Sequence, residues 1–130
     1  MLDYAFCSMT LVGPLRGWTM NPVMNDTKWK ELRLAMYSLG PQAPKWRNRV
    51  LVSGYVSPWD GDWYYRFREG GYTDIEWVEI QIISLDQRAA VLALIQSIHL
   101  PGCETELGFK IIGYAAPAHL SPCGASLEYI

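Results

Sequence analysis

The chain has 130 residues, a length that predicts one domain large enough to bury a hydrophobic core. Half of its residues are hydrophobic and 18% are charged, which excludes a disordered chain and is typical of a globular protein. The formal net charge is −2, but the charges are unevenly distributed. Residues 24–58 carry six basic and two acidic side chains, whereas residues 59–130 carry four basic and ten acidic ones. Such a distribution can steer a partner of opposite charge, although it does not specify a fold.

The cysteines and the N-terminal residues bear on where the protein works. Cys7, Cys103 and Cys123 are an odd number at scattered spacings, which favours a reducing cytoplasm. Residues 1–23 carry an acid where a secretory signal needs cations, and Gly13-Pro14 interrupts them before a bilayer could be spanned. We therefore expect neither export nor membrane insertion. Met24 directly precedes a helix cap, and we interpret residues 1–23 as an N-terminal extension or arm and residues 24–130 as a single α+β domain.

The first predicted element is an amphipathic helix from Asn25 or Asp26 to about Leu39. Its apolar side chains recur at helical spacing. Gly40-Pro41 ends it, because glycine suits a left-handed cap and proline cannot continue the hydrogen-bond ladder. The apolar face comprises Trp29, Leu32, Met36 and Leu39.

Three strands are expected next, at residues 50–56, 63–67 and 75–83. Asp60-Gly61 and Gly70-Gly71 are interpreted as the hairpin turns between them, since tight turns need positive φ angles. The apolar residues of the third strand change phase between Trp77 and Val78. Either a bulge lies there or both faces of the strand are partly covered.

A second helix is predicted from a capping box at Ser84–Gln87 to about His99. Its apolar stripe runs through Ala89, Leu92, Ile95 and His99, widened by Val91, Leu94 and Ile98, and is typical of a core helix. A last strand is expected at residues 108–115. The order α-β-β-β-α-β predicts an α+β fold, with an antiparallel sheet of about four strands covered on one face by two helices.

The segment WDGDWYYRFREGGYTDIEWVEIQI (59–82) is the most distinctive stretch, because aromatic residues alternate there with six carboxylates against two arginines. The chain has six tryptophans and eight tyrosines, more than a small core can bury with their polar atoms paired, so some should reach the surface and anchor a partner. We therefore predict a partner-binding surface on this segment, with the residues Trp59, Asp60, Asp62, Glu69, Asp74 and Glu76.

Other chemistries are weighed against simpler interpretations. His99, Cys103, His119 and Cys123 have donor types that suit zinc, but paired Cys-x-x-Cys knuckles are missing, so we expect a helix-end histidine and unrelated thiols. The same residues lack the signature of a Cys-His nucleophile. The clustered carboxylates of residues 59–82 are typical of a solvent-exposed, charged sheet face rather than of a catalytic acid/base pair. Accordingly we predict no catalytic residue, no metal and no cofactor.

The basic stretch Lys45-Trp46-Arg47-Asn48-Arg49 could contact phosphate and stack a base. Three cations in a chain of pI about 5.6 favour instead a salt-bridge partner for the acidic strands. We expect no nucleic-acid ligand.

The stretches MNDTKWKELRLAM, WDGDWYYRFREGGYTDIEWVEI and IHLPGCETELGFKIIGY, within residues 24–114, resemble an uncharacterised family of short bacterial proteins. Proteins of this type are often similar to immunity proteins, small acidic α+β domains that neutralise an antibacterial toxin. The resemblance implies no catalytic residue. It suggests a cytoplasmic binding protein, an immunity-type inhibitor whose acidic aromatic surface occupies a basic site on a protein partner. The alternative is a small enzyme or metal-binding protein that uses the His/Cys set or the clustered carboxylates.

Overall fold

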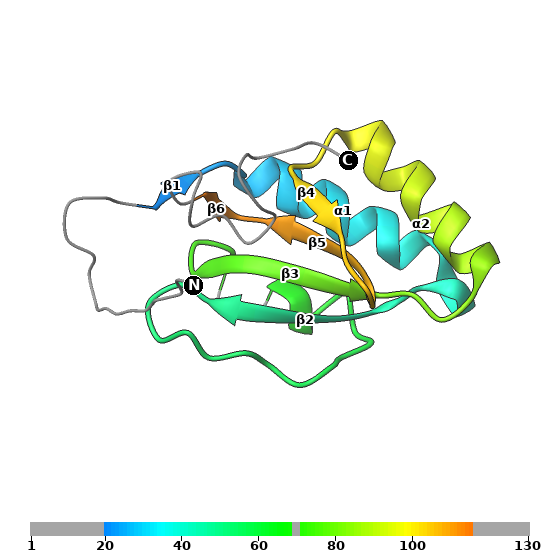
Figure 1. Ribbon diagram of the computed structural model, residues 1–130, viewed down its shortest axis with the longest axis horizontal. Helices are drawn as coiled ribbons and strands as arrows, with labels where there is room; N and C mark the ends of the chain where they lie inside the picture. The colour runs from blue at the N-terminus through cyan, green and yellow to red at the C-terminus, as the bar shows by residue number, and fades with distance from the viewer. Residues whose placement is uncertain (1–19, 69–70, 116–130) are drawn as a thin grey trace.

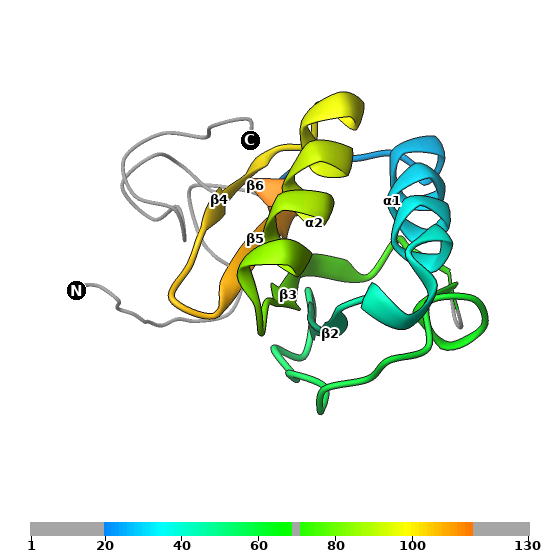
Figure 2. The ribbon, with the colours of Figure 1, turned by 90° about the vertical axis from the view of Figure 1, so that its right-hand side faces the viewer.

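The computed structural model describes residues 20–68 and 71–115. Its main sheet has four antiparallel strands in the order β2-β3-β5-β4. Helices α1 and α2 lie together against one face of this sheet (Figures 1 and 2). The predicted α+β class, with two helices on an antiparallel sheet of four strands, is confirmed. The strands of this sheet are β2 (Lys45–Val50), β3 (Ile75–Gln81), β4 (Gly102–Glu104) and β5 (Gly108–Ile112).

A second, two-stranded sheet pairs β1 (Asn21–Pro22) with β6 (Tyr114–Ala115). The Val23 amide also donates to the carbonyl of Gly113, which fixes the entry to α1. Residues 21–23, which precede the predicted domain boundary at Met24, thus pair with residues 113–115.

Helix α1 (Asp26–Ser38) begins and ends where its caps predict. The Asn25 side chain accepts a hydrogen bond from the Lys28 amide, and Gly40 adopts the positive φ that ends the helix. The predicted face is confirmed for Trp29, Leu32 and Met36, which are buried, while Leu39 is partly buried. Arg33 is also buried on this helix, and periodicity alone did not predict a buried charge there.

Helix α2 (Leu85–Ile98) is capped by Ser84, whose hydroxyl accepts from the Gln87 amide. The capping box is confirmed on this side only. On the other side the Gln87 carboxamide accepts from the Ile83 amide rather than from that of Ser84, and it donates to the carbonyl of Gln42. The C-cap, His99, takes the left-handed conformation at φ 62°.

The buried stripe of α2 differs from the predicted one. It follows Gln87, Val91 and Ile95 at a spacing of four, whereas Ala89 and His99 are exposed. The reason is that the helix packs against the sheet on one side and contacts α1 on another. A broad apolar pattern cannot reveal which of its sides faces each neighbour.

The predicted strands at 50–56 and 63–67 are wrong. The first strand of the main sheet is instead β2, the basic stretch Lys45–Val50. The chain turns immediately after it, with Gly54 at φ 74°. Residues 63–67 form turns and part of a 3-10 helix, Arg66–Arg68. Gly71 has the expected positive φ but Gly61 does not, so Asp60-Gly61 is not the predicted hairpin turn.

Strand β3 is buried on both faces from Trp77 to Ile80. Of the two alternatives for the phase change between Trp77 and Val78, a bulge at that step is therefore wrong and coverage of both faces is confirmed. The register does shift one step earlier, where Arg49 pairs with Trp77 but Val50 pairs with Ile75. Glu76 is the extra residue accommodated there.

The predicted strand at 108–115 is divided at Gly113 into β5 and β6. A side chain at Gly113 would place its Cβ 2.3 Å from the carbonyl oxygen of Ile75, so only glycine fits this close approach. Strand β4 was not predicted, since three residues carry too little pattern to be recognised.

Candidate functional site

The loop between β2 and β3 (51–74) folds back along the outer edge of β2. Trp46 and Asp60 exchange both backbone hydrogen bonds, at 2.9 and 2.8 Å. Asn48 is similarly bonded to Ser57, through its carbonyl to the Ser57 amide and through its amide to the Ser57 hydroxyl. The loop therefore occupies the edge that β2 would otherwise present to another strand.

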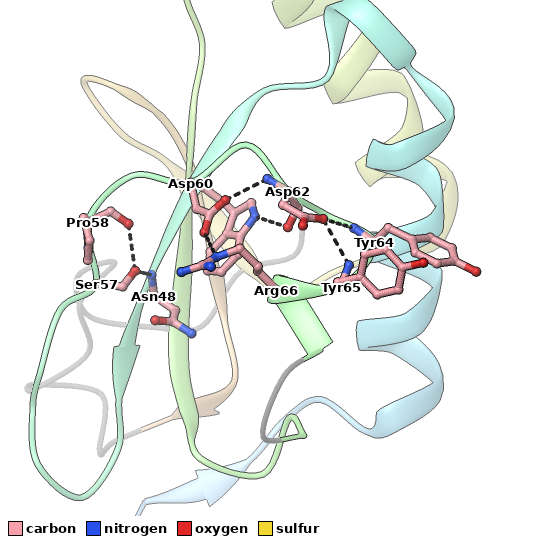
Figure 3. Close-up of polar contacts among 9 residues, drawn as sticks. Asn48, Ser57, Pro58, Asp60, Asp62, Tyr64, Tyr65 and Arg66 are labelled. Carbon is pink, nitrogen blue, oxygen red and sulfur yellow. Dashed lines mark hydrogen bonds and ion pairs between the residues drawn. The ribbon is translucent and has the colours of Figure 1, made fainter.

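Two acidic residues set the shape of this loop (Figure 3). Asp60 accepts from the Asp62 amide at 2.8 Å and from Nε of Arg66 at 2.6 Å. Asp62 accepts from the amides of Tyr64 and Tyr65, at 2.9 and 3.0 Å. Such bonds from Asp side chains to the following amides stabilise tight turns. Both carboxylates thus have local structural partners.

Two aromatic residues anchor the loop in the core. Trp63 is 1% exposed, and its indole N–H donates to the carbonyl of Pro44 at 2.7 Å. Phe67 is equally buried, with its ring centre 4.7 Å from that of Trp63 and 5.1 Å from that of Trp46. The loop is therefore held at two buried points four residues apart, and the residues between them have defined positions.

The residues between these anchors form an exposed aromatic surface next to α1. Tyr64 and Tyr65 stack edge to face at 4.7 Å, and Tyr37 on α1 lies 5.1 Å from Tyr64. Their exposed fractions are 55% for Tyr37, 37% for Tyr64 and 64% for Tyr65. The guanidinium of Arg68 lies 5.5 Å from the Tyr64 ring centre and 5.8 Å from that of Tyr65.

Arg33 lies beneath this surface. Its guanidinium is 5.2 Å from the Tyr64 ring centre and donates to the Tyr64 carbonyl at 2.8 Å. We define the tyrosine–arginine patch as Arg33, Tyr37, Tyr64, Tyr65 and Arg68. Within it, the helix and the loop are held together by a buried cation.

The predicted partner-binding residues fall into two groups at opposite ends of β2. Trp59, Asp60 and Asp62 lie on the loop near Trp46, at the start of that strand. Asp74 and Glu76 lie near its end, where the Asp74 carbonyl accepts from the Leu51 amide. Glu69 lies outside the described residues. The five described members of the predicted set therefore lie in two places along β2.

Their exposure also differs. Trp59 is partly buried, with the Arg47 guanidinium 4.5 Å from its ring centre. Asp74 is exposed, whereas Glu76 is partly buried in an ion pair with Arg49 at 3.0 Å. Among the acids of the predicted set that the structure describes, only Asp74 is exposed.

The basic stretch on β2 pairs with acids on β3. Arg47 donates to Glu79 through both Nε and Nη2, at 3.0 and 2.8 Å, and Arg49 donates to Glu76. The predicted role of this stretch, as a salt-bridge partner for an acidic strand, is confirmed. Two of the six carboxylates of residues 59–82, Glu76 and Glu79, are therefore paired within the sheet.

The sheet face opposite the helices holds charged groups that are partly shielded from solvent. Burial raises the pKa of Glu76 above its ordinary value, and the Arg49 charge and hydrogen bond only partly offset this. Burial likewise lowers the pKa of Lys110, against the attraction of Glu79. Lys110 lies 4.2 Å from the ring centre of Trp77. For Glu76 and Lys110, attraction to the neighbouring opposite charges therefore offsets only part of the cost of burying the charged form.

The His/Cys set gives no metal site among residues 20–68 and 71–115, where no three metal-ligating side chains come together. His99 is exposed at the end of α2, and Cys103 on β4 is disulfide-bonded. His119 and Cys123 lie outside the described residues. In the same part of the chain, no helix is both long and apolar enough to cross a membrane.

A small hollow of about 110 Å³ lies at the start of α1, lined by residues that include Trp29, Tyr72 and Tyr114. The Tyr114 hydroxyl donates to the carbonyl of Thr73 beside it. Pockets for small-molecule ligands are usually about 300–1,000 Å³. The hollow is thus small for an organic substrate.

Comparison with known proteins gives one match. A model described as a family of unknown function (DUF6678) matches residues 17–118. No curated protein and no solved structure matches the chain. The expected resemblance to an uncharacterised family is confirmed to this extent.

Proposed function

The chain belongs to DUF6678, a family of unknown function, and from its surface geometry we propose that it is a non-catalytic protein that binds a protein partner. The observation that carries this proposal is the tyrosine–arginine patch. Tyrosine and arginine are enriched among the residues that dominate protein–protein binding energy. Three clustered tyrosine rings, two of them more than half exposed, match this composition.

The patch is also held in a fixed arrangement before any partner binds. Asp62 fixes the backbone of Tyr64 and Tyr65, Trp63 and Phe67 anchor the loop on either side, and Tyr37 stands on α1. Immobilising a flexible side chain costs about 0.5–1.5 kcal/mol in an interface, so a surface that is already ordered loses less on binding. This rigidity supports a binding role.

The most concrete form of the proposal is a bacterial immunity-type inhibitor that neutralises a toxin or effector in the cytoplasm. Its support is the small α+β architecture together with an ordered aromatic surface on the segment 59–68. Trp59, Asp60, Asp62, Glu69, Asp74 and Glu76 remain predicted partner-binding residues. The disulfide at Cys103 is the observation that argues against a cytoplasmic site, because disulfides are rare in that compartment.

Photo-crosslinking in cells of the source organism tests the proposal. The full chain would carry p-benzoylphenylalanine at position 65, and a second version would carry it at position 55. Tyr55 is a matched control because it is 60% exposed but lies on the turn after β2, outside the patch. We expect one protein to be captured from position 65 and not from position 55.

The captured protein then tests the immunity-type form directly. Expressed alone in a sensitive host it should stop growth, and coexpression with this chain should restore growth. Equal capture at positions 55 and 65, or capture at neither, would contradict the binding surface. A captured protein that is harmless alone would contradict the immunity-type form only.

A further inference from the structure

The sheet face opposite the helices carries two buried apolar side chains, Trp77 on β3 and Ile112 on β5. They pair across the two strands and are 9% and 1% exposed. The next pair along, Val78 and Ile111, belongs to the hydrophobic core that the described residues form under the helices, and Trp77 and Ile112 are outside that core. Because successive side chains of a strand point to opposite faces, Trp77 and Ile112 lie on the face away from the helices.

The cover over Ile112 comes neither from the helices nor from the sheet itself. Both helices lie on the other face (Figure 2). Within the sheet, Ile112 is flanked by Trp77 on one side and on the other by Pro101, whose carbonyl accepts from the Ile112 amide. Side chains stand roughly perpendicular to a sheet, so neighbouring strands leave their outer ends open. An exposure of 1% therefore requires further atoms over this face.

Cys103 lies on the same face of the sheet. It pairs with Lys110 on β5, whose Nζ is 4.2 Å from the ring centre of Trp77, so the three side chains share one side. Cys103 is disulfide-bonded. The other two cysteines of the chain, Cys7 and Cys123, both lie outside the described residues. In a single chain, the disulfide therefore fastens one of the two terminal segments to this face.

Chain length favours Cys123 over Cys7 as the partner. Cys123 lies eight residues after Ala115, the last described residue, whereas Cys7 lies thirteen residues before Met20, the first. Eight extended residues span about 26–29 Å, and Ala115 is five residues beyond the position that pairs with Cys103, a distance of about 18 Å at most. Effective concentration falls roughly as the −3/2 power of tether length, so the shorter tether closes more readily.

We propose that Cys103 is bonded to Cys123 and that residues 116–123 lie over Trp77 and Ile112. The occupant of this sheet face is thus the chain's own C-terminal segment. The inference goes beyond the proposed function and is independent of it, because the tyrosine–arginine patch is built from α1 and the loop 51–74.

The composition of residues 116–123 suits this role. Their sequence, APAHLSPC, contains no Asp, Glu, Lys or Arg and offers Leu120 and two prolines as apolar cover. Apolar surface is buried favourably without further pairing, whereas buried charges would each need a partner. Proline also disfavours the helical conformation in the residue before it, which keeps such a segment extended and gives it the greatest reach per residue.

The bond forms by thiol–disulfide exchange. The thiols of Cys103 and Cys123 give up two protons and two electrons in total, and a low-molecular-weight disulfide such as oxidised glutathione accepts them and becomes two thiols. A dithiol reverses the reaction and is itself oxidised to a disulfide. The attachment of residues 116–123 therefore follows the redox state of the surroundings.

Peptide mapping tests which cysteines are bonded. The full chain is equilibrated with oxidised glutathione, its free thiols are blocked with N-ethylmaleimide, and it is digested with trypsin without reduction. Trypsin places the three cysteines in separate peptides, 1–16, 89–110 and 111–130. We expect 89–110 to be linked to 111–130, with the blocked thiol on 1–16. An equal or larger amount of 89–110 linked to 1–16, or a blocked thiol on 89–110, would overturn the proposal.

Methyl NMR of the full chain tests the cover. In the oxidised protein we expect a nuclear Overhauser effect between the δ1 methyl group of Ile112 and the methyl groups of Leu120. In Cys123→Ser this contact should be lost and the Ile112 resonance should shift, while that of Ile80, which is buried under the helices, stays in place. Cys7→Ser is the matched control, because it removes a cysteine from the other terminal segment, and it should leave the Ile112 resonance unchanged.

Three results would overturn the covering role even where the bond forms. The first is the absence of the Ile112–Leu120 contact in the oxidised wild type, which needs no variant. The second is an Ile112 resonance that Cys123→Ser leaves unchanged. The third is an equal shift of that resonance in Cys7→Ser.

Discussion

At the scale of single residues, burial separates the aromatic side chains into those that hold the fold and those that face solvent. Trp29, Trp46 and Trp63 are in the core, whereas Tyr37 and Tyr65 are more than half exposed. The composition predicts that some aromatic residues reach the surface, and this is confirmed. The composition could not predict which aromatic residues these are. Trp63 and Tyr65 lie two positions apart in the same loop, and the turns of the loop decide which side chain points into the core and which into solvent.

Arg33 shows the same limit for a charged residue. Helical spacing places position 33 next to the apolar stripe of α1, and a long cationic side chain there is usually solvated. Its burial depends on Tyr64, 31 positions later, which covers the guanidinium. The patch could therefore not be recognised from the sequence, although Arg33 and Tyr37 at i and i+4 indicate that they share one side of the helix.

Glu76 gives a prediction about pH at the same scale. Burial raises its pKa above 4.5, so the folded protein binds this proton more tightly than the unfolded chain does. The resulting stability is fully present below pH 4.5 and is lost as the pH rises through the raised pKa. Glu76→Gln removes this loss, so its denaturation midpoint should match that of the wild type at low pH and exceed it at pH 7.

The measurement is urea unfolding of both proteins on each side of that window. Comparing them at each pH cancels the titration of the other carboxylates. A variant that is less stable than the wild type at pH 7 would mean that the ion pair with Arg49, at 3.0 Å, outweighs the cost of burial.

At the scale of elements, both helices were predictable, whereas among the strands only those of residues 75–83 and 108–115 were. Asn25, Gly40 and Ser84 are local signals, because each satisfies or ends hydrogen bonds within its own helix. The strand Lys45–Val50 has a basic sequence that is tolerated only because acids on β3 lie opposite it. The loop 51–74 has strand-like aromatic residues, but its aspartates bond to the backbone and turn the chain.

The loop supports a prediction about Asp62, whose carboxylate orders the backbone of the two exposed tyrosines. Asp62→Ala removes the acceptor of the Tyr64 and Tyr65 amides. We expect faster hydrogen exchange at these two amides and weaker partner binding, with unchanged exchange at the amides of the β3–β5 pair. The loss of stability should be about 1 kcal/mol, as for other turn and cap side chains.

Hydrogen exchange followed by mass spectrometry or NMR checks this expectation. Asp74→Ala is the control, since its side chain is exposed on the same loop and its contact with the Leu51 amide is made by the main-chain carbonyl, which the substitution keeps. If Asp62→Ala and Asp74→Ala behave alike, the Asp62 bonds do not order the tyrosines.

At the scale of the whole molecule, the fold places three tyrosines and two arginines from α1 and the loop on one surface, while the charges of β2 and β3 neutralise one another. The α+β class followed from the order of elements. The position of the tyrosine–arginine patch did not, because charge asymmetry along a sequence does not show which charges pair in space. Residues 24–58 and 59–130, which are opposite in net charge, are joined by the ion pairs Arg47–Glu79 and Arg49–Glu76.

The most direct test of the binding surface is the dissociation constant of the captured partner for two tyrosine variants, Tyr65→Ala and Tyr55→Ala. Their side chains are 64% and 60% exposed, so neither change should disturb the fold. The account predicts that Tyr65→Ala weakens binding by about 2 kcal/mol, as for an interface hot spot, and that Tyr55→Ala leaves it unchanged. Unchanged binding by Tyr65→Ala, or an equal loss in both variants, would contradict it.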